Sequence, residues 1–182
     1  MSRAADLERV RERLAEWREW LEGDPGARAE MRRAATVGDA MMTRAFAELA
    51  YSVNGPRPTE GGAPDHGAPS RLAALARTAL VLARMPPASP VAPAPRVAEA
   101  MGRERRGRTE VGPIRAEALF RSADADEACR SLCGIAGQVG ACDPGDVYLA
   151  MLRWDAARQE WAMRFNLAAV AMKRAAAASK GA

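Results

Sequence analysis

The stretch SRLAALARTALVLA (residues 70–83) decides the fold of this chain. Its apolar residues recur at helical spacing and cover most sides of the resulting helix: Leu72, Leu75, Ala76, Ala79, Leu80 and Leu82. A helix that is apolar on most of its sides is buried among other elements. We therefore expect this segment, with Ser70 as its N-cap, to be the central helix of a bundle.

Upstream of this segment the sequence predicts three further helices. The first has an apolar face at spacings of three and four, formed by Leu7, Val10, Leu14, Trp17 and Leu21. GDPG (23–26) ends it, and Pro25 suits the start of the next helix, which contains ARAEMRRAA. Asp39 is expected to cap the third.

Downstream, the pattern predicts short helices near residues 97–101 and before Arg121, and three longer ones. Asp124, Asp143 and Asp155 are the expected N-caps of the longer three, with Pro144 in the first turn of the second. The buried stripe of the last helix is expected to consist of Trp161, Phe165, Ala168 and Met172.

No segment alternates apolar and polar residues over the length of a strand. The predicted fold is all-α: a compact bundle of about eight helices with no sheet. We expect one domain over residues 5–172 and a flexible tail over 173–182. Within the domain, N-terminal helices (5–84) and C-terminal helices (96–172) flank a proline-rich connection (85–95). The Gly- and Pro-rich segment 54–70 is predicted to be a mobile surface loop.

Positive charge is concentrated in two parts of the chain. Of 27 basic residues only Lys173 and Lys180 are lysines, and the formal net charge is +4. Residues 103–121 contain six Arg and three Glu, and residues 28–44 contain four Arg and two acids. The run GRERRGRTE (102–110) has four arginines: Arg103, Arg105, Arg106 and Arg108. Such a run is either a solvated loop or a phosphate-binding strip. Because aromatics are scarce near it, the strip would bind the sugar–phosphate backbone without reading base sequence.

The sequence argues against an enzyme, and we expect no catalytic residues, metal or cofactor. The one histidine, His66, lies in the Gly/Pro loop, with no positioned partner predicted for it. Cys129, Cys133 and Cys142 could ligate zinc together with His66, but they lack the C-x2-C spacing, and buried structural cysteines are the preferred interpretation. No signal peptide or membrane-spanning stretch is visible, and the cysteine usage suggests a reduced cytoplasmic compartment.

Several sequence elements follow one another in the order typical of a known family. Arg115 opens a helix containing LFR (119–121), an Asp-rich turn follows, and a DP start leads into a helix ending in LRWD (152–155). The last helix contains Arg158 and the aromatic Phe165. In order and spacing, over residues 10–170, the chain resembles the CasB family, the small subunit of the type I-E CRISPR Cascade surveillance complex.

This resemblance implies a helical, non-catalytic protein that assembles with other Cascade subunits and with a second copy of itself. It implies contact with the CRISPR guide RNA and with the target and non-target DNA strands. By holding nucleic acid, above all the displaced strand, such a protein stabilises the R-loop in antiviral defence, while base pairing reads the sequence. Position by position, the resemblance points to Arg32, Arg33, Arg71, Arg115, Arg121 and Arg158.

The chain also departs from the family pattern. Cys133 and Gly134 stand where the family often has arginines, and acidic residues around Asp124 replace a basic one. We expect the run at residues 103–108 to compensate for this lost charge. Two alternatives remain open: a helix-turn-helix regulator of duplex DNA, and a purely structural adaptor whose arginines meet protein carboxylates.

Overall fold

The computed structural model describes residues 3–54, 68–86, 94–105, 108–109 and 111–180. The fold is all-α, as predicted, and the described part contains ten helices where about eight were expected. The helices are α1 (Arg3–Gly23), α2 (Pro25–Arg33), α3 (Val37–Met41), α4 (Arg44–Asn54), α5 (Ala68–Arg84), α6 (Val97–Gly102), α7 (Pro113–Phe120), α8 (Ala125–Val139), α9 (Pro144–Leu152) and α10 (Trp154–Lys180). The only described extended element is a two-residue antiparallel ladder between β1 (Glu104–Arg105) and β2 (Arg108–Thr109), which the sequence did not predict.

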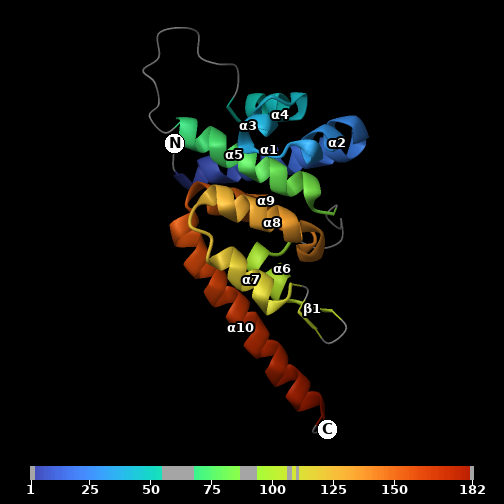
Figure 1. The fold of residues 1–182 in the computed structure, drawn as a ribbon, viewed down its shortest axis with the longest axis vertical. Coiled ribbons are helices and arrows are strands. Elements are labelled where there is room, and N and C mark those ends of the chain that lie inside the picture. Colours follow the sequence, from blue (N-terminus) through green and yellow to red (C-terminus); the bar gives the residue numbers. More distant parts are fainter. Residues whose placement is uncertain (1–2, 55–67, 87–93, 106–107, 110, 181–182) are drawn as a thin grey trace.

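Helix α5 is the centre of the molecule, which confirms the interpretation of its sequence. It contacts α1 to α4 from the N-terminal half and α8 and α9 from the C-terminal half (Figure 1). Residues 74–76 and 78–83 are all buried. The buried Thr78 hydroxyl donates to the Ala74 carbonyl oxygen at 2.7 Å, so its polar group is satisfied within the helix. The helix begins at Ala68, so Ser70 lies in its first turn and is not the N-cap.

Aspartates cap three helices; Asp124 and Asp143 were predicted as caps, and Asp24 was not. Asp24 accepts from Ala27 N–H at 2.9 Å, Asp124 from Asp126 and Glu127 N–H, and Asp143 from Gly145 N–H. Each carboxylate thereby satisfies a backbone donor that the first helical turn leaves without an intrahelical partner.

Two of the predicted caps are different in the structure. Thr36 is the N-cap of α3, and Asp39 is its partner in a capping box, in which it accepts from Thr36 N–H at 2.9 Å. Arg153 is the C-cap of α9, and helix α10 begins at the next residue, Trp154. Asp155 therefore lies inside the first turn of α10. In both helices the aspartate lies in the first turn, and at α3 the cap is Thr36, three residues before Asp39.

Helix α10 packs along the C-terminal half through the predicted aromatic stripe. Trp161 and Phe165 are buried, whereas Ala168 is only partly buried. Phe165 meets Phe120 of α7 edge to face, with ring centroids 5.8 Å apart. The Nε1–H of Trp154 donates to the Ser122 carbonyl oxygen at 2.9 Å, which ties the start of α10 to the turn before α8.

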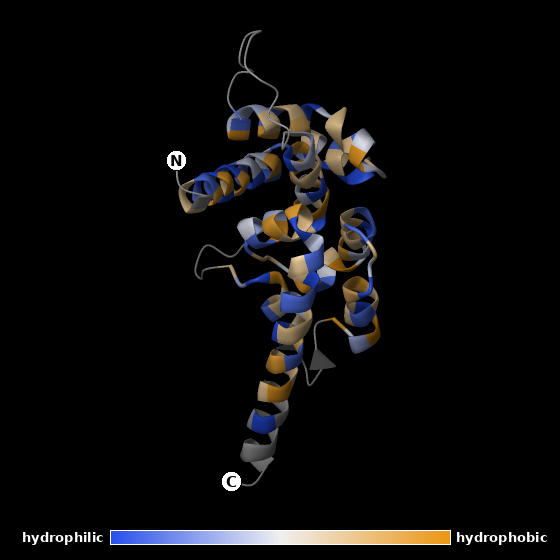
Figure 2. Ribbon diagram, turned by 90° about the vertical axis from the view of Figure 1, so that its left-hand side faces the viewer, coloured by the Kyte–Doolittle hydropathy of each residue, from blue (hydrophilic) through white to orange (hydrophobic). Residues whose placement is uncertain are grey.

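The same helix continues to Lys180, past the domain boundary that the sequence placed at residue 172. The residues after Arg174 are rich in alanine, the strongest helix former. Apolar residues lie along the part of α10 that extends beyond the other helices (Figure 2). No helix in the described residues is both long enough and apolar enough to cross a bilayer.

Candidate nucleic-acid interface

Two described pieces of the arginine run, Glu104–Arg105 and Arg108–Thr109, pair as a short antiparallel hairpin between α6 and α7. In its backbone register Glu104 lies opposite Thr109, and Arg105 opposite Arg108. Arg106 lies outside the described residues. The base of this segment is anchored by the buried Val111, whose N–H donates to the Met101 carbonyl oxygen at 3.3 Å. The backbone on both sides of the run is therefore fixed to the helical body.

Three described arginines lie next to this hairpin in the chain or on α7, and they differ in whether a carboxylate neutralises them. Arg103 and Arg115 are exposed, and within the described residues their side chains form no hydrogen bond or ion pair. Arg121 is also exposed but donates to the Glu117 carboxylate at 2.6 Å, one helical turn earlier. We call these three residues the hairpin–α7 group. Two of its guanidinium groups are thus available to an external anion.

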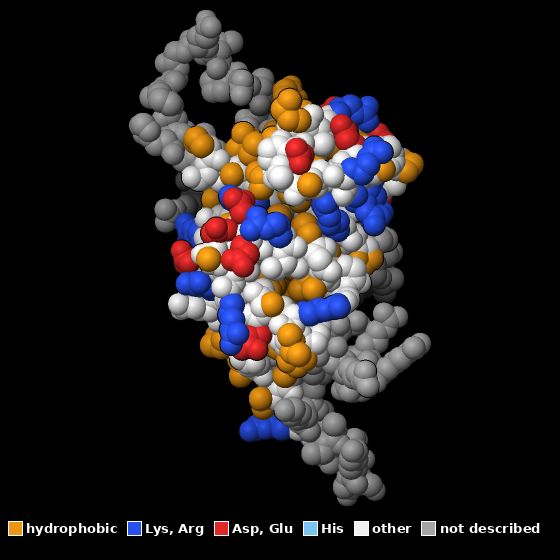
Figure 3. Space-filling view, viewed as in Figure 1, with side chains coloured by type: hydrophobic (Ala, Val, Ile, Leu, Met, Phe, Trp, Pro, Cys, Tyr) orange, Lys and Arg blue, Asp and Glu red, His pale blue; other side chains and the backbone are white. Residues whose placement is uncertain are grey.

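A second group, the α2 group, consists of Arg32, Arg33, Arg84 and Arg130. Arg32 and Arg33 are exposed in the last turn of α2 and, in the described part of the chain, their side chains have no partner. Arg84 donates to the carbonyl oxygens of Leu80, Arg32 and Ala34, at 2.8, 2.7 and 2.9 Å. Lys and Arg side chains gather on the part of the surface that α2 covers (Figure 3).

The two remaining predicted residues, Arg71 and Arg158, come from the starts of α5 and α10. Both helix starts line one hollow of about 490 Å³, to which Ser70, Trp154 and Asp155 contribute. Arg71 is exposed, whereas Arg158 is partly buried and pairs with the Asp155 carboxylate at 3.4 Å. Asp124 lines the same hollow, so the positive charge there is offset by two carboxylates.

Those of the ten predicted arginines whose side chains the structure describes do not form one continuous strip. Helix α2 lies near one end of the body, and α7 with the hairpin lies on the other side of α8 and α9 (Figure 1). Within the described residues, the hairpin–α7 group and the α2 group offer unpaired guanidinium groups. At the start of α10, by contrast, the guanidinium group of Arg158 is paired with the Asp155 carboxylate. The sequence shows two concentrations of charge along the chain, but it does not show that they face different parts of the surface.

Some arginines, both inside and outside the basic segments, are used within the fold, which the charge pattern of the sequence did not reveal. Arg28 donates to the carbonyl oxygens of Ala83 and Met85 at the end of α5, at 3.4 and 3.0 Å. Arg18 is buried, donates to the Pro86 carbonyl oxygen and lies 3.7 Å from the Glu22 carboxylate. Burial lowers the pKa of Arg18, although arginine keeps its charge in proteins. Its spacing of four from Leu14 and three from Leu21 is the signal that places it on the buried face.

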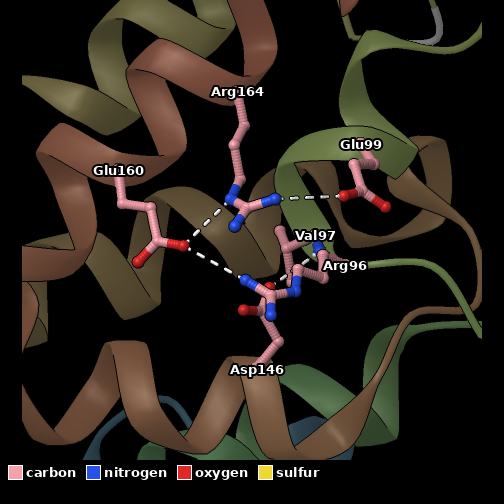
Figure 4. A network of polar contacts seen from close by, with 6 residues as sticks. All are labelled: Arg96, Val97, Glu99, Asp146, Glu160 and Arg164. Carbon is pink, nitrogen blue, oxygen red and sulfur yellow. Dashed lines mark hydrogen bonds and ion pairs between the residues drawn. The ribbon is translucent and has the colours of Figure 1, made fainter.

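A network of ion pairs joins α6 to α10 (Figure 4). Both of its arginines are paired with glutamates, so it offers no unpaired guanidinium group to an external anion. Glu160 accepts from Arg96 at 3.1 Å and from Arg164 at 2.9 Å, and Arg164 also reaches Glu99 at 3.3 Å. Beside the network, the Asp146 carboxylate accepts from Val97 N–H at 2.9 Å, which holds the start of α6 against α9. Burial raises the pKa of Asp146, and the Val97 N–H opposes that rise.

The three cysteines are free thiols. Cys129 and Cys142 are buried, as the structural interpretation predicts, whereas Cys133 is only half-buried. Among the described residues, no three His, Cys, Asp or Glu side chains lie together in a way that could hold a metal ion. His66, the fourth ligand considered for zinc, lies outside the described residues.

Comparison of the chain with protein-family models, with curated proteins and with solved structures gives no match. The surface just described is therefore interpreted from its own chemistry.

Proposed function

We propose that this chain is the non-catalytic small subunit of a type I-E CRISPR Cascade complex. In that role it binds the sugar–phosphate backbones of the guide RNA, the target strand and above all the displaced non-target strand, and thereby stabilises the R-loop. The order of sequence elements over residues 10–170 and the all-α fold support this assignment. Bond cleavage is left to a separate helicase–nuclease, while base pairing reads the target sequence.

The observation that carries the proposal is a set of exposed guanidinium groups, on helices or directly after one, without acidic partners among the described residues. Arg32, Arg33, Arg103 and Arg115 are exposed, and in the described residues no carboxylate neutralises them. A guanidinium group presents a planar fork of donors that matches phosphate oxygens. Each phosphate contact also releases counterions, which favours binding at low salt.

The distribution of these groups supports contact with backbone at more than one place. The α2 group and the hairpin–α7 group lie on different parts of the surface, which suits a long strand or two separate strands. The exposed large aromatics of the described residues, Trp20 and Tyr51, lie on α1 and α4, and neither is on an element that carries the arginines of the two groups. Base stacking is therefore expected to contribute little, so the binding is independent of sequence.

The proposal is tested by purifying the tagged chain together with the proteins encoded beside it. The expected result is a complex that contains a guide RNA of uniform length and retains a matching DNA target as an R-loop. A triple variant, Arg32→Glu, Arg33→Glu and Arg115→Glu, should still join the complex but should shorten the lifetime of the R-loop. The matched control is Arg9→Glu with Arg13→Glu, which reverses exposed charge on α1, outside both groups. Purification of the chain without RNA or companion proteins would contradict the proposal.

The structural adaptor remains a second candidate because α10 exposes an apolar stripe. Met163, Leu167 and Val170 follow one another at helical spacing and are about half exposed or more, at 57%, 60% and 48%. Such a stripe suits contact with another protein. For a pure adaptor, the charge-reversal triple variant would leave nucleic-acid binding unchanged. A helix-turn-helix regulator would instead bind one duplex sequence in isolation.

A further inference from the structure

A pocket of about 490 Å³ lies between the α2–α3 connection, α5 and α8. Two thiols and two guanidinium groups line it: Cys129, Cys133, Arg84 and Arg130. Cys129 and Cys133 are four residues apart on α8, so their side chains lie on the same face of that helix. Cys129 is 3% exposed and Cys133 is half-buried, so Cys133 is the thiol that a small molecule in the pocket can reach.

The charges around this pocket favour an anion. Arg84 is fixed by its three carbonyl contacts, and within the described residues no carboxylate pairs with it. Arg130 is exposed and, within the described residues, its side chain forms no hydrogen bond or ion pair, although its charge acts on the nearby Asp124 carboxylate. The acidic residue in the lining, Asp126, lies 2.6 Å from the guanidinium group of Arg77, which offsets its charge. The pocket therefore presents a net positive surface to its contents.

The two cysteines are chemically unequal. The Cys129 thiol donates to the Arg77 carbonyl oxygen, 3.6 Å from its sulfur. When Cys133 is a thiolate, its charge makes it the stronger acceptor for the Cys129 proton, one turn away on the same face of α8. Donation from Cys129 raises the pKa of the Cys129 thiol and lowers that of Cys133, and the positive charge of Arg84 lowers the Cys133 pKa further. The thiolate is the nucleophilic form of cysteine.

The helix disfavours a disulfide between these two thiols. Cβ atoms four residues apart on a helix are about 5–6 Å apart. A disulfide requires a Cβ separation of about 3.5–4.5 Å. Because α8 would have to bend to close that bond, an external disulfide is the better partner for Cys133.

We propose that Cys133 is a modification site for low-molecular-weight disulfides that carry carboxylates, such as glutathione disulfide. The Cys133 thiolate attacks one sulfur of the disulfide and forms a Cys133–S–S–R bond. The other sulfur leaves as a thiolate with the electron pair of the broken S–S bond, so Cys133 is oxidised and one RS group is reduced. The carboxylates of the reagent are held by Arg84 and Arg130 at the pocket wall.

The test uses the reduced full chain, glutathione disulfide at neutral pH, intact-mass spectrometry and peptide mapping. One glutathionyl group should add, on Cys133, and the adduct should be lost in Cys133→Ser and kept in Cys142→Ser. Arg130→Gln should slow the reaction with glutathione disulfide several-fold and leave the rate with uncharged bis(hydroxyethyl) disulfide unchanged. Circular dichroism and thermal unfolding of each variant establish that it is folded.

Four results would overturn the proposal. The first two are an adduct on Cys129 or Cys142 of the folded chain and an internal Cys129–Cys133 disulfide. The third is a reaction at Cys133 no faster in the folded chain than in the urea-unfolded chain. The fourth is an Arg130→Gln variant that changes the rates of both reagents equally or changes neither, because the pocket charge would then play no part in selection.

Discussion

The guanidinium group of Arg84 lies 2.7 Å from the carbonyl oxygen of Arg32. Arg84 is the last residue of the central helix α5, and Arg32 belongs to the last turn of α2. The last carbonyl groups of a helix have no intrahelical donor, and a cation there also interacts with the negative end of the helix dipole. The buried centre of the bundle therefore fixes the end of the helix that presents the exposed Arg32 and Arg33.

Replacing Arg84 by methionine should lower the free energy of unfolding by about 2 kcal/mol, because hydrogen bonds from a charged donor are stronger than neutral ones. The loss leaves the carbonyl groups of Leu80, Arg32 and Ala34 without this donor. Urea denaturation measures the change. Arg33→Gln is the control, with an expected change within about 0.5 kcal/mol, since its side chain is exposed. Equal effects of the two substitutions would contradict this role of Arg84.

Gly102 is required by the close approach of α6 to α10. A Cβ atom at this position would lie 2.7 Å from the Cβ of Ala168. Gly102→Ala should therefore destabilise the protein by about 1–3 kcal/mol, through overpacking between two helices. Thermal unfolding would show the loss, and adding Ala168→Gly should restore part of it.

The matched control for Gly102 is Gly134, which lies in α8 with open space around its Cα. Gly134→Ala should stabilise the chain by about 0.5–1 kcal/mol, because alanine favours helix over glycine. If both substitutions moved the melting temperature in the same direction, the proposed packing of Gly102 on Ala168 would be wrong.

Asp146 should give the stability of the fold a specific pH dependence. Burial raises its pKa above the ordinary value of 3.8, so the folded chain binds this proton more readily than the unfolded chain. Its contribution to stability is present below the ordinary pKa and is lost as the pH rises through the raised one. An asparagine would still accept from Val97 N–H without a buried charge. Asp146→Asn should thus be at least as stable as the natural chain at neutral pH, and its advantage should shrink as the pH falls toward 3.8.

Asp124 provides the opposite sign for comparison. The N–H groups of Glu127 and Asp126 lower the pKa of its carboxyl group, which caps α8. Its contribution is present above the ordinary pKa and is lost as the pH falls through the lowered one. Asp124→Asn should therefore cost stability at neutral pH and less in acid. Urea titrations at several pH values would separate the two carboxylates, and parallel pH profiles of the two variants would contradict both assignments.

Trp17 should be sensitive to a substitution that keeps its aromatic bulk. Its indole N–H donates to the Ala45 carbonyl oxygen at 2.8 Å, inside the contact between α1 and α4. Trp17→Phe leaves that buried carbonyl without its donor and should cost about 1–3 kcal/mol. Trp20→Phe is the control, because Trp20 is 37% exposed. Equal losses for the two variants in urea denaturation would count against the importance of the hydrogen bond.

Much of the fold could be predicted because its signals are local. The apolar spacing of residues 70–83 requires burial, and an aspartate before a helix satisfies donors that are close to it in sequence. The shift from Asp39 to Thr36 at the start of α3 arises from the same local chemistry, since both residues take part in the capping box. The end of α10 was misplaced because its alanine-rich tail has no apolar periodicity, although its helix propensity is high.

The roles of the arginines could not be predicted because they depend on long-range contacts. Arg28 and Arg32 are one turn apart on α2, yet Arg28 donates to Met85 and Arg32 points to solvent. Their roles differ because Arg28 faces the end of α5, which lies more than fifty residues further along the chain. Charge density in the sequence therefore located basic regions, while only the packing of α2 on α5 determined which guanidinium groups are free.

The most direct test of the central claim is the salt dependence of the affinity of the chain for single-stranded DNA. With about four phosphate contacts, the logarithm of the association constant should fall against the logarithm of salt concentration with a slope of about −3. Arg32→Gln with Arg33→Gln should make that slope shallower by about 1.4, since two contacts are lost. A slope near zero, or one that the double variant leaves unchanged, would contradict phosphate binding by these arginines.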